Sequence, residues 1–307
     1  MDNLLVTGGS GMVGRNLLEH SASKSYNVFA PSSHELNLFD YDAVLRYLKV
    51  NSIDVIIHCA GLVGGIQANI QDPVSFLNTN LTMGVNLVNA ARCVGVKKLL
   101  NLGSSCMYPR DYTNPLKEEY LLCAPLEPTN EGYALAKIAV AKLCEYTSKQ
   151  FGVEYKTLIP CNLYGRGDKF GESNSHLIPA VIKKIHQAKL TANSVIELWG
   201  DGEARREFML ASDCADGIFF ALNNFTKLDY YTNLGVGHDY SINDYYRMIA
   251  EVIGYDGTFV HDLTKPVGMR QKLIDISKMK NLGWSAPHNL VSGLTETYNY
   301  FLESEGV

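Results

Sequence analysis

Short runs of apolar residues alternate along the chain with longer segments in which apolar residues recur every three or four positions. The short runs suit buried strands, and the longer segments suit amphipathic helices. In the first half of the chain the candidate strands are residues 3–7, 27–30, 54–59, 98–102 and 155–160. This alternation predicts an α/β fold, a doubly wound parallel (Rossmann) sheet with helices on both faces.

A smaller C-terminal substrate lobe is expected beside this sheet. No repeat, low-complexity tract or Gly/Ser-rich linker interrupts the 307 residues, so we expect insertions to build the lobe. Residues 213–222 are predicted to form a helix and residues 230–234 a strand, both returning to the sheet. The resulting division is 1–165 and 207–236 for the Rossmann domain, and 166–206 and 237–307 for the lobe.

The charge and cysteine content argue against several classes of function. The 27 Lys and Arg against 32 Asp and Glu give a net charge of −5, which argues against a nucleic-acid or membrane partner. The seven cysteines form no C-x-x-C pair and the eight histidines show no ligand spacing, so neither a disulfide framework nor a metal site is expected. Without a basic leader or an apolar run of about 20 residues, we expect a cytoplasmic protein.

A glycine-rich loop follows the first candidate strand. Gly8, Gly11 and Gly14 stand three residues apart, directly before an amphipathic helix. Glycine lets the backbone approach a pyrophosphate closely, and the N-terminus of a helix offers it free N–H groups. An ordinary glycine turn is the alternative, but the position at the first strand favours dinucleotide binding. The expected cofactor contacts of this loop are Gly8, Ser10, Gly11, Met12, Val13 and Gly14.

The turn after the second candidate strand bears on the choice of cofactor. It consists of Ala30-Pro31-Ser32-Ser33-His34, where an NAD-selective site usually carries Asp or Glu for the ribose 2′-hydroxyl. Because that acid is missing, a 2′-phosphate is tolerated, and Ser32, Ser33 and His34 can meet it. An exposed polar turn without a cofactor role is the alternative. We therefore predict NADP(H) as the cofactor.

A serine, a tyrosine and a lysine form the candidate catalytic group. Tyr133 and Lys137 lie four residues apart at the start of a predicted helix, so their side chains share one face. Such a pair is usually a solvated helix face, but Ser104 follows a buried strand at the edge where doubly wound sheets bind ligands. The ammonium lowers the pKa of the phenol. Ser104 then binds a substrate carbonyl, Tyr133 delivers its proton, and a cofactor hydride attacks the carbon.

The glycine motif and the Ser-Tyr-Lys group together resemble the extended short-chain dehydrogenase/reductase family, most of whose members process nucleotide sugars. Nearly the whole chain is similar to the GDP-L-fucose synthases of that family, which are 3,5-epimerase/4-reductases of GDP-4-keto-6-deoxy-mannose. The stretches that carry this resemblance are Val63-Gly64-Gly65-Ile66, Gly103-Ser104-Ser105-Cys106-Met107-Tyr108-Pro109, Pro128-Thr129-Asn130-Glu131, Asn162-Leu163-Tyr164-Gly165, Ser173-Asn174-Ser175-His176-Leu177-Ile178-Pro179 and Arg206-Glu207-Phe208.

The resemblance implies a second catalytic pair. It makes Cys106 and His176 the base and acid that invert C3 and C5 of the sugar. Protons beside a C4 ketone are acidic, and a thiol and an imidazole have intrinsic pKa values suited to moving them. Taken alone, Cys106 is more typical of a buried apolar position and His176 of a structural histidine.

The resemblance also implies the substrate and its contacts. Arg206 matches the arginine that binds the nucleotide diphosphate, for which a guanidinium fork is suited. Asn162, Asn174 and Lys272 match positions along the substrate cleft, and Tyr133 and Lys137 also contact the cofactor. The implied partner is a GDP-linked 4-keto sugar, and the implied assembly is a homodimer.

Departures from the family pattern keep other functions open. Arg166-Gly167 stands where bacterial members carry Pro-His, and Cys161 replaces a threonine. Some members have an arginine at the position of Ser10 and in the turn after the second strand, and this chain has neither. The alternatives are an enzyme that only reduces C4, a related GDP-4-keto heptose as substrate, and a non-catalytic dinucleotide-binding sensor. A sensor has no need of Ser104, Tyr133 and Lys137 together.

Overall fold

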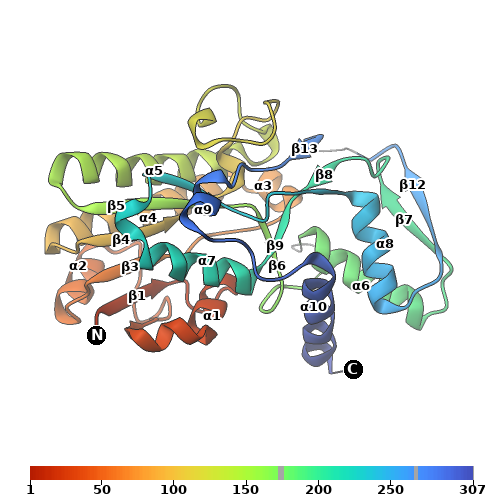
Figure 1. Cartoon of the computed structure of the whole chain (residues 1–307), viewed down its shortest axis with the longest axis horizontal. Coiled ribbons are helices and arrows are strands. Elements are labelled where there is room, and N and C mark those ends of the chain that lie inside the picture. Colours follow the sequence, from red (N-terminus) through yellow and green to blue (C-terminus); the bar gives the residue numbers. More distant parts are fainter. Residues whose placement is uncertain (172–175, 266–268, 307) are drawn as a thin grey trace.

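Six parallel strands form the central sheet of the computed structural model, which describes residues 1–171, 176–265 and 269–306 (Figure 1). The strand order is β10-β5-β4-β3-β1-β2, and every neighbouring pair is parallel. The strands are β1 (Asn3–Thr7), β2 (Asn27–Phe29), β3 (Val55–His58), β4 (Lys98–Leu102), β5 (Glu154–Pro160) and β10 (Tyr231–Leu234). The predicted doubly wound sheet is confirmed, and its strand order reverses between β1 and β3, where such sheets bind ligands.

Helices cover both faces of the sheet because successive strand residues point to opposite sides. On one face Leu5, Ile56 and Leu99 pack with α2, α4 and α5. On the other face Leu4 and Ile57 pack with α1 and α7 (Figure 1). These helices are α1 (Met12–Glu19), α2 (Tyr41–Val50), α4 (Pro73–Val94), α5 (Glu131–Phe151) and α7 (Ala211–Asn223).

The observed bounds differ little from the predicted ones. β2 ends at Phe29, one residue before the predicted end, and β5 begins at Glu154, one residue early. The helix predicted over residues 213–222 is the middle of α7, and the strand predicted over residues 230–234 is β10. Pro31 has no N–H with which to extend a ladder, which favours an early end of β2.

A second hydrophobic cluster lies beside the sheet. Ile182, Leu198, Ile249 and Phe301 are among its buried residues. Parallel pairs β6–β9 and β7–β12 run through it. Its elements are β6 (Asn162–Tyr164), α6 (Leu177–Leu190), β7 (Val195–Trp199), β9 (Phe208–Leu210), α8 (Ile242–Ile253), β12 (Thr258–Asp262) and α10 (Leu290–Glu305). The assignment of residues 166–206 and 237–307 to a separate lobe stays a proposal.

A small three-stranded sheet, β11-β8-β13, lies between the two clusters (Figure 1). After it, Ile274, Ile276 and Met279 rejoin the core of the main sheet. The remaining elements are α3 (Ile66–Gln71), β8 (Arg205–Arg206), β11 (Tyr240–Ser241), β13 (Gln271–Lys272), α9 (Ser277–Leu282) and short 3-10 turns. Among these turns, η2 (Ser105–Met107) contains Cys106 and η3 (Glu118–Tyr120) contains Glu118. In the described part of the chain no helix has the length and apolar character needed to cross a membrane.

Candidate active site

The glycine loop lies between β1 and α1, at the reversal of strand order. Gly8 has a φ of 74°, and a β-carbon there would lie 2.7 Å from the Ala60 nitrogen, so only glycine fits. A β-carbon at Gly14 would lie 2.2 Å from the Gly8 carbonyl oxygen. Gly11 precedes α1 and makes no side-chain cap, which leaves the first N–H groups of the helix to a ligand. The other members of the loop are exposed or half-buried: Ser10, Met12 and Val13.

The turn after β2 contains an acid that the sequence analysis missed. Glu35 Oε2 accepts hydrogen bonds from the backbone N–H and the hydroxyl of Ser32, both at 2.8 Å. These bonds lower the pKa of Glu35. Ser32 and Ser33 are exposed, but Ser32 already donates to a carboxylate. The signal in the sequence is the spacing of Ser32 and Glu35, which is that of a capping box. Glu35 lies one residue beyond the turn at residues 30–34.

Ser104, Tyr133 and Lys137 meet at the carboxyl end of β4. Ser104 lies two residues after the end of β4 and caps η2, where its Oγ accepts from the Cys106 N–H at 3.2 Å. Tyr133 and Lys137 lie in the first two turns of α5, which packs against η2. Lys137 Nζ lies 5.8 Å from the centre of the Tyr133 ring and donates to the Leu102 carbonyl at 2.9 Å. The structure therefore brings the three candidate residues together.

Burial controls the ionisation of this group. Burial raises the pKa of Tyr133, the nearby Cys106 raises it further, and a hydrogen bond with Ser104 lowers it. Burial also lowers the pKa of Lys137 to about 8. Desolvation of the phenolate is the largest of these effects, so the net shift of the Tyr133 pKa is upward. At neutral pH Tyr133 is a protonated phenol that can donate.

Cys106 lies in η2 and receives two hydrogen bonds. Asn130 Nδ2 donates to Sγ at 3.2 Å, and Lys272 Nζ donates at 3.5 Å from β13. Asn130 Oδ1 is buried without a hydrogen-bond partner in the described part of the chain. Asn130 was not singled out from the sequence, where its only signal was its place in the stretch Pro128-Thr129-Asn130-Glu131.

His176 and the two candidate asparagines are less closely tied to Cys106. His176 precedes α6 and is half-buried, and burial lowers the pKa of its imidazole. No hydrogen bond joins it to Cys106 among the residues that the structure describes. Asn162 Nδ2 donates to the Glu207 carbonyl at 3.0 Å. Asn174 lies outside the described residues.

The two arginines of β8 have different environments. Arg205 Nε donates to Asp239 Oδ1 at 2.8 Å, so this guanidinium is held by an ion pair. Arg206 Nη1 donates to the Arg205 carbonyl at 2.7 Å, and burial lowers the pKa of its guanidinium, while the nearby Glu127 carboxylate opposes that shift. Arg206 is paired with Lys272 across β8 and β13. The structure thus places two cations beside Cys106.

A buried carboxylate fixes the strands that carry these cations. Glu207 accepts backbone hydrogen bonds from Val236, Gly237 and Ile274 at 2.7, 2.8 and 2.9 Å. Burial raises the pKa of Glu207 to about 7. Because the three N–H groups belong to two different segments, Glu207 holds β8 against both the loop after β10 and the chain after β13.

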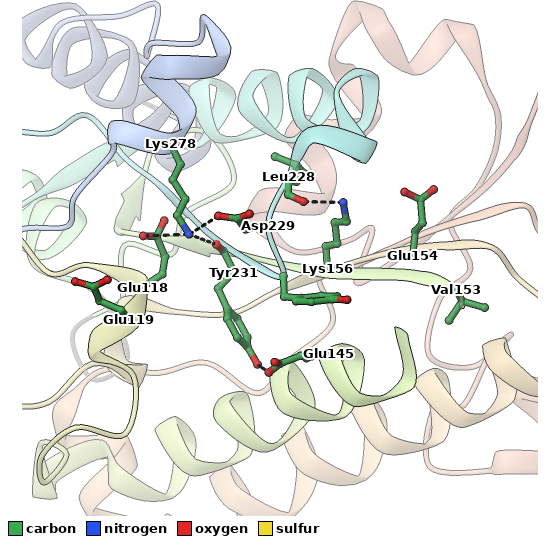
Figure 2. Close-up of a pocket in the computed structure, with 11 residues that line it drawn as sticks. Glu118, Glu119, Glu145, Val153, Glu154, Lys156, Leu228, Asp229, Tyr231 and Lys278 are labelled. Atoms are coloured by element: carbon green, nitrogen blue, oxygen red, sulfur yellow. Dashed lines mark hydrogen bonds and ion pairs between the residues drawn. The ribbon is translucent and has the colours of Figure 1, made fainter. Parts of the chain in front are cut away.

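A separate hollow of about 580 Å³ opens at the amino ends of β5 and β10 (Figure 2). Some of its charged groups form ion pairs, and Lys156 donates to the backbone carbonyls of Phe225 and Leu228. Lys278 Nζ lies 2.8 Å from Asp229 and 3.6 Å from Glu118, and Glu145 accepts from the Tyr231 hydroxyl. The hollow is therefore an ion-pair network far along the sheet from Ser104. Within the described residues, no group of three His, Cys, Asp or Glu side chains is arranged to hold a metal.

A dinucleotide loop at the switch point and a Ser-Tyr-Lys group at the neighbouring strand end define an oxidoreductase of the short-chain dehydrogenase type. The fold and the order of these features along the chain agree with that class. The chain belongs to the NAD dependent epimerase/dehydratase family, which it matches over residues 4–237.

Similar proteins match the chain over nearly its full length. It is 55% identical over 303 residues to the GDP-L-colitose synthase of Yersinia pseudotuberculosis, covering 98% of each chain. It is 48% identical over 304 residues to the GDP-L-fucose synthase of Azorhizobium caulinodans, covering 99% of this chain and 97% of the relative. The GDP-mannoheptose C4 reductase of Campylobacter jejuni, solved with NADP bound, has a TM-score of 0.88 and 31% identity over 98% of both chains.

Proposed function

We propose that the protein reduces C4 of a GDP-linked 4-keto-6-deoxy sugar with NADPH and inverts C3 and C5 before that reduction. The observation that carries this proposal is the convergence of Ser104, Tyr133 and Lys137 with Cys106 and Lys272 at one end of the sheet. The first three suit a carbonyl reduction, and a thiol between two donors suits proton removal beside the carbonyl. The named activities of the relatives support a GDP-linked substrate.

The glycine loop fits the diphosphate of NADP(H). A side chain at Gly8 or Gly14 would fill the space against the backbone, and the uncapped start of α1 offers N–H groups to an anion. Ser32 and Ser33 would lie toward the adenosine ribose. When bound, NADPH supplies the hydride for C4.

Tyr133 gives the C4 oxygen its proton. The phenol is neutral because burial raises its pKa, and the Ser104 hydroxyl donates to the same oxygen and orients it. Lys137, with a pKa of about 8, is mostly an ammonium at pH 7 and stabilises the phenolate that remains.

Cys106 removes the protons at C3 and C5, which the neighbouring ketone makes acidic. Asn130 and Lys272 donate to Sγ and so hold the sulfur in place as a base. His176, at the start of α6, returns protons from the other side of the sugar. Arg206 binds the diphosphate, and Asn162 contributes to the cleft.

A second candidate substrate is a GDP-4-keto-3,6-dideoxy sugar. The 55% identity to a GDP-L-colitose synthase favours it. Colitose has no 3-hydroxyl, so C3 is not a stereocentre and only C5 would be inverted. A GDP-4-keto heptose that is only reduced at C4 is the further alternative, which the likeness to the heptose reductase supports.

One experiment separates these substrates. The protein is incubated in D₂O with NADPH and, in turn, the 6-deoxy, the 3,6-dideoxy and the heptose 4-ketone of the GDP sugar. NADPH oxidation is followed at 340 nm, and deuterium is located by NMR. We expect fast turnover of one of the hexoses with deuterium at C5, and at C3 for the 6-deoxy sugar. Turnover of the heptose alone without deuterium uptake would leave a simple C4 reductase.

We also propose that the protein is a cytoplasmic homodimer. Val74 of α4 is 74% exposed, and Leu135 and Tyr146 of α5 are 41% and 57% exposed, although the two helices pack together. A second copy would cover such side chains. Sedimentation should give a dimer for the wild type and a monomer for Leu135→Asp. A wild-type monomer at micromolar concentration would contradict the proposal.

A further inference from the structure

A buried tyrosine ties the turn that contains Cys106 to the edge strand β10. Tyr108 directly follows η2 and is 1% exposed. Its hydroxyl donates to Asn233 Oδ1 of β10 at 2.6 Å. Because Asn233 is 0% exposed, water does not compete for this hydrogen bond. Tyr108 therefore fixes the end of the turn in which the sulfur lies.

The same asparagine binds the segment that carries Lys272. Asn233 Nδ2 donates to the carbonyls of Leu116 and Asp275 at 2.9 and 3.0 Å. Asp275 lies three residues after Lys272. Leu116 pairs with this segment, because its N–H donates to the Leu273 carbonyl at 2.8 Å and its carbonyl accepts from the Asp275 N–H at 2.9 Å. One fully bonded amide thus joins the segment after β13 to the turn after β4.

The group that suits carbonyl reduction is anchored in another way. Ser104 lies beside Gly103, whose N–H donates to the backbone of β5 at 2.8 Å, and the other two members belong to α5. Cys106 and Lys272, in contrast, come from segments 166 positions apart and meet at 3.5 Å. A shift of either segment would therefore disturb the contact of Cys106 more than the reducing group.

We propose that Tyr108 and Asn233 are positioning residues for epimerisation. Their hydrogen bond sets the distance between Cys106 Sγ and the Lys272 ammonium. This inference rests on the proposed function, because it takes Cys106 as the base. Without the bond the ammonium moves away from the sulfur, and the thiolate that removes the sugar protons loses its nearby positive charge. Reduction at C4 does not use this contact and should continue.

The first measurement is deuterium uptake at C5 of GDP-4-keto-6-deoxy-mannose in D₂O, with NADP⁺ so that no hydride is supplied. Tyr108→Phe keeps the ring in the core and removes the hydroxyl. Because a small displacement of a catalytic group is costly, we expect uptake to slow about tenfold. In the Cys106→Ser background, where reduction proceeds without epimerisation, Tyr108→Phe should change NADPH oxidation by less than about twofold.

The second measurement needs no substrate and follows the alkylation of Cys106 by iodoacetamide, read by peptide mass spectrometry. Lys272→Met should slow this reaction about fivefold, and Tyr108→Phe about two- to fivefold. The double variant should be no slower than Lys272→Met, because both changes act through one contact. The exposed Cys93 and Cys123 serve as internal references and should react at unchanged rates.

Tyr155→Phe is the matched control. Tyr155 is 0% exposed, and its hydroxyl donates to the Val96 carbonyl at 2.9 Å, near the amino ends of β4 and β5. Its loss should lower the denaturation midpoint about as much as the loss of the Tyr108 hydroxyl. Deuterium uptake and alkylation should keep their wild-type rates.

Each outcome decides a different point. Unchanged uptake in Tyr108→Phe, or equal slowing in Tyr155→Phe, would overturn the inference, because the hydroxyl would then serve stability alone. Additive slowing of alkylation in the double variant would also overturn it, since Tyr108 would not act through Lys272. If the wild type took up no deuterium, the proposed epimerisation would fall, whereas alkylation would still show whether Tyr108 places Lys272 beside the sulfur.

Discussion

The two ends of the central sheet hold buried charged groups in different ways. At the amino ends of β5 and β10, the Glu145 carboxylate has a side-chain exposure of 10% and is bound by Lys142 and Lys149. The Tyr231 hydroxyl also donates to it (Figure 2). These partners lower the pKa of Glu145 to about 2, although burial opposes them. Lys278 is likewise paired with Asp229 and Glu118, whereas the buried Lys156 donates to the backbone carbonyls of Phe225 and Leu228.

At the carboxyl end of β4 the described residues give the Lys137 ammonium no carboxylate partner. The Lys137 ammonium donates to a backbone carbonyl, and burial shifts its pKa and that of Tyr133 toward their neutral forms. Asn130 Oδ1 is buried without a hydrogen bond in the described part of the chain. Such an arrangement costs stability, and active sites are where that cost is found. The comparison teaches that charge density alone does not locate the site.

The largest expected effect separates two half-buried tyrosines. Tyr133→Phe should lower kcat for reduction by about 10²- to 10⁴-fold, because it removes the proton donor. Dinucleotide affinity should change little. Tyr231→Phe, which removes the hydroxyl bound to Glu145, should leave kcat unchanged. Stopped-flow measurement of NADPH oxidation checks both variants. Equal losses of kcat in the two variants would contradict the proposed difference between the two ends of the sheet.

Epimerisation should be separable from reduction at Cys106. Cys106→Ser should slow deuterium uptake at C5 by about 10²-fold, because an alcohol is a far weaker base than a thiol. Hydride transfer should persist and give the unepimerised product. His176→Asn should uncouple solvent exchange from inversion. NMR of the isolated products gives the deuterium uptake and the configuration of the sugar. Deuterium uptake at the wild-type rate in Cys106→Ser would show that Cys106 is only a packing residue.

The activity should depend on the ionisation of Lys137. Its pKa of about 8 means that it is an ammonium below pH 8 and neutral above it. If the ammonium is needed, kcat/KM for reduction should fall above pH 8, approaching tenfold per pH unit. Rates measured from pH 6 to 10 at saturating NADPH test this. A value of kcat/KM that stayed constant up to pH 10 would show that reduction does not depend on the ionisation of Lys137.

The smallest expected effect lies in the hollow. Lys278→Met leaves Glu118 and Asp229 without their shared cation, so the free energy of unfolding should fall by about 1 kcal/mol. Reduction should keep its wild-type kcat/KM. Glu119→Gln, which changes an exposed acid of the same hollow, should change neither quantity. Denaturant unfolding monitored by circular dichroism gives the difference, and loss of activity without loss of stability would argue for a functional site there.

The main sheet was predictable because its strands are continuous apolar runs buried on both faces, such as Leu99 and Leu100 of β4. The strands β8 and β13 were not predictable. They are two residues long, and their sequences, Arg205-Arg206 and Gln271-Lys272, are polar. Only the fold brings them together, across more than sixty positions.

The candidate site was predictable where its spacing is local. Tyr133 and Lys137 are one helical turn apart, and Ser104 follows the end of a predicted strand. Asn130 and Glu35 were missed, since a place in a matched stretch and a Ser-x-x-Glu spacing are weak signals until the partners of the side chains are known. The link between Cys106 and Lys272 spans 166 positions, so composition and spacing do not reveal it.

The most direct test of the account follows the hydride itself. NADPH deuterated at C4 of the nicotinamide is incubated with the GDP-4-keto sugar in H₂O, and the deuterium content of the sugar is read by NMR. The account predicts one deuterium at C4 for the wild type and for Cys106→Ser, and none for Tyr133→Phe over the same time. A wild-type product that carries no deuterium at C4, or full transfer by Tyr133→Phe, would contradict it.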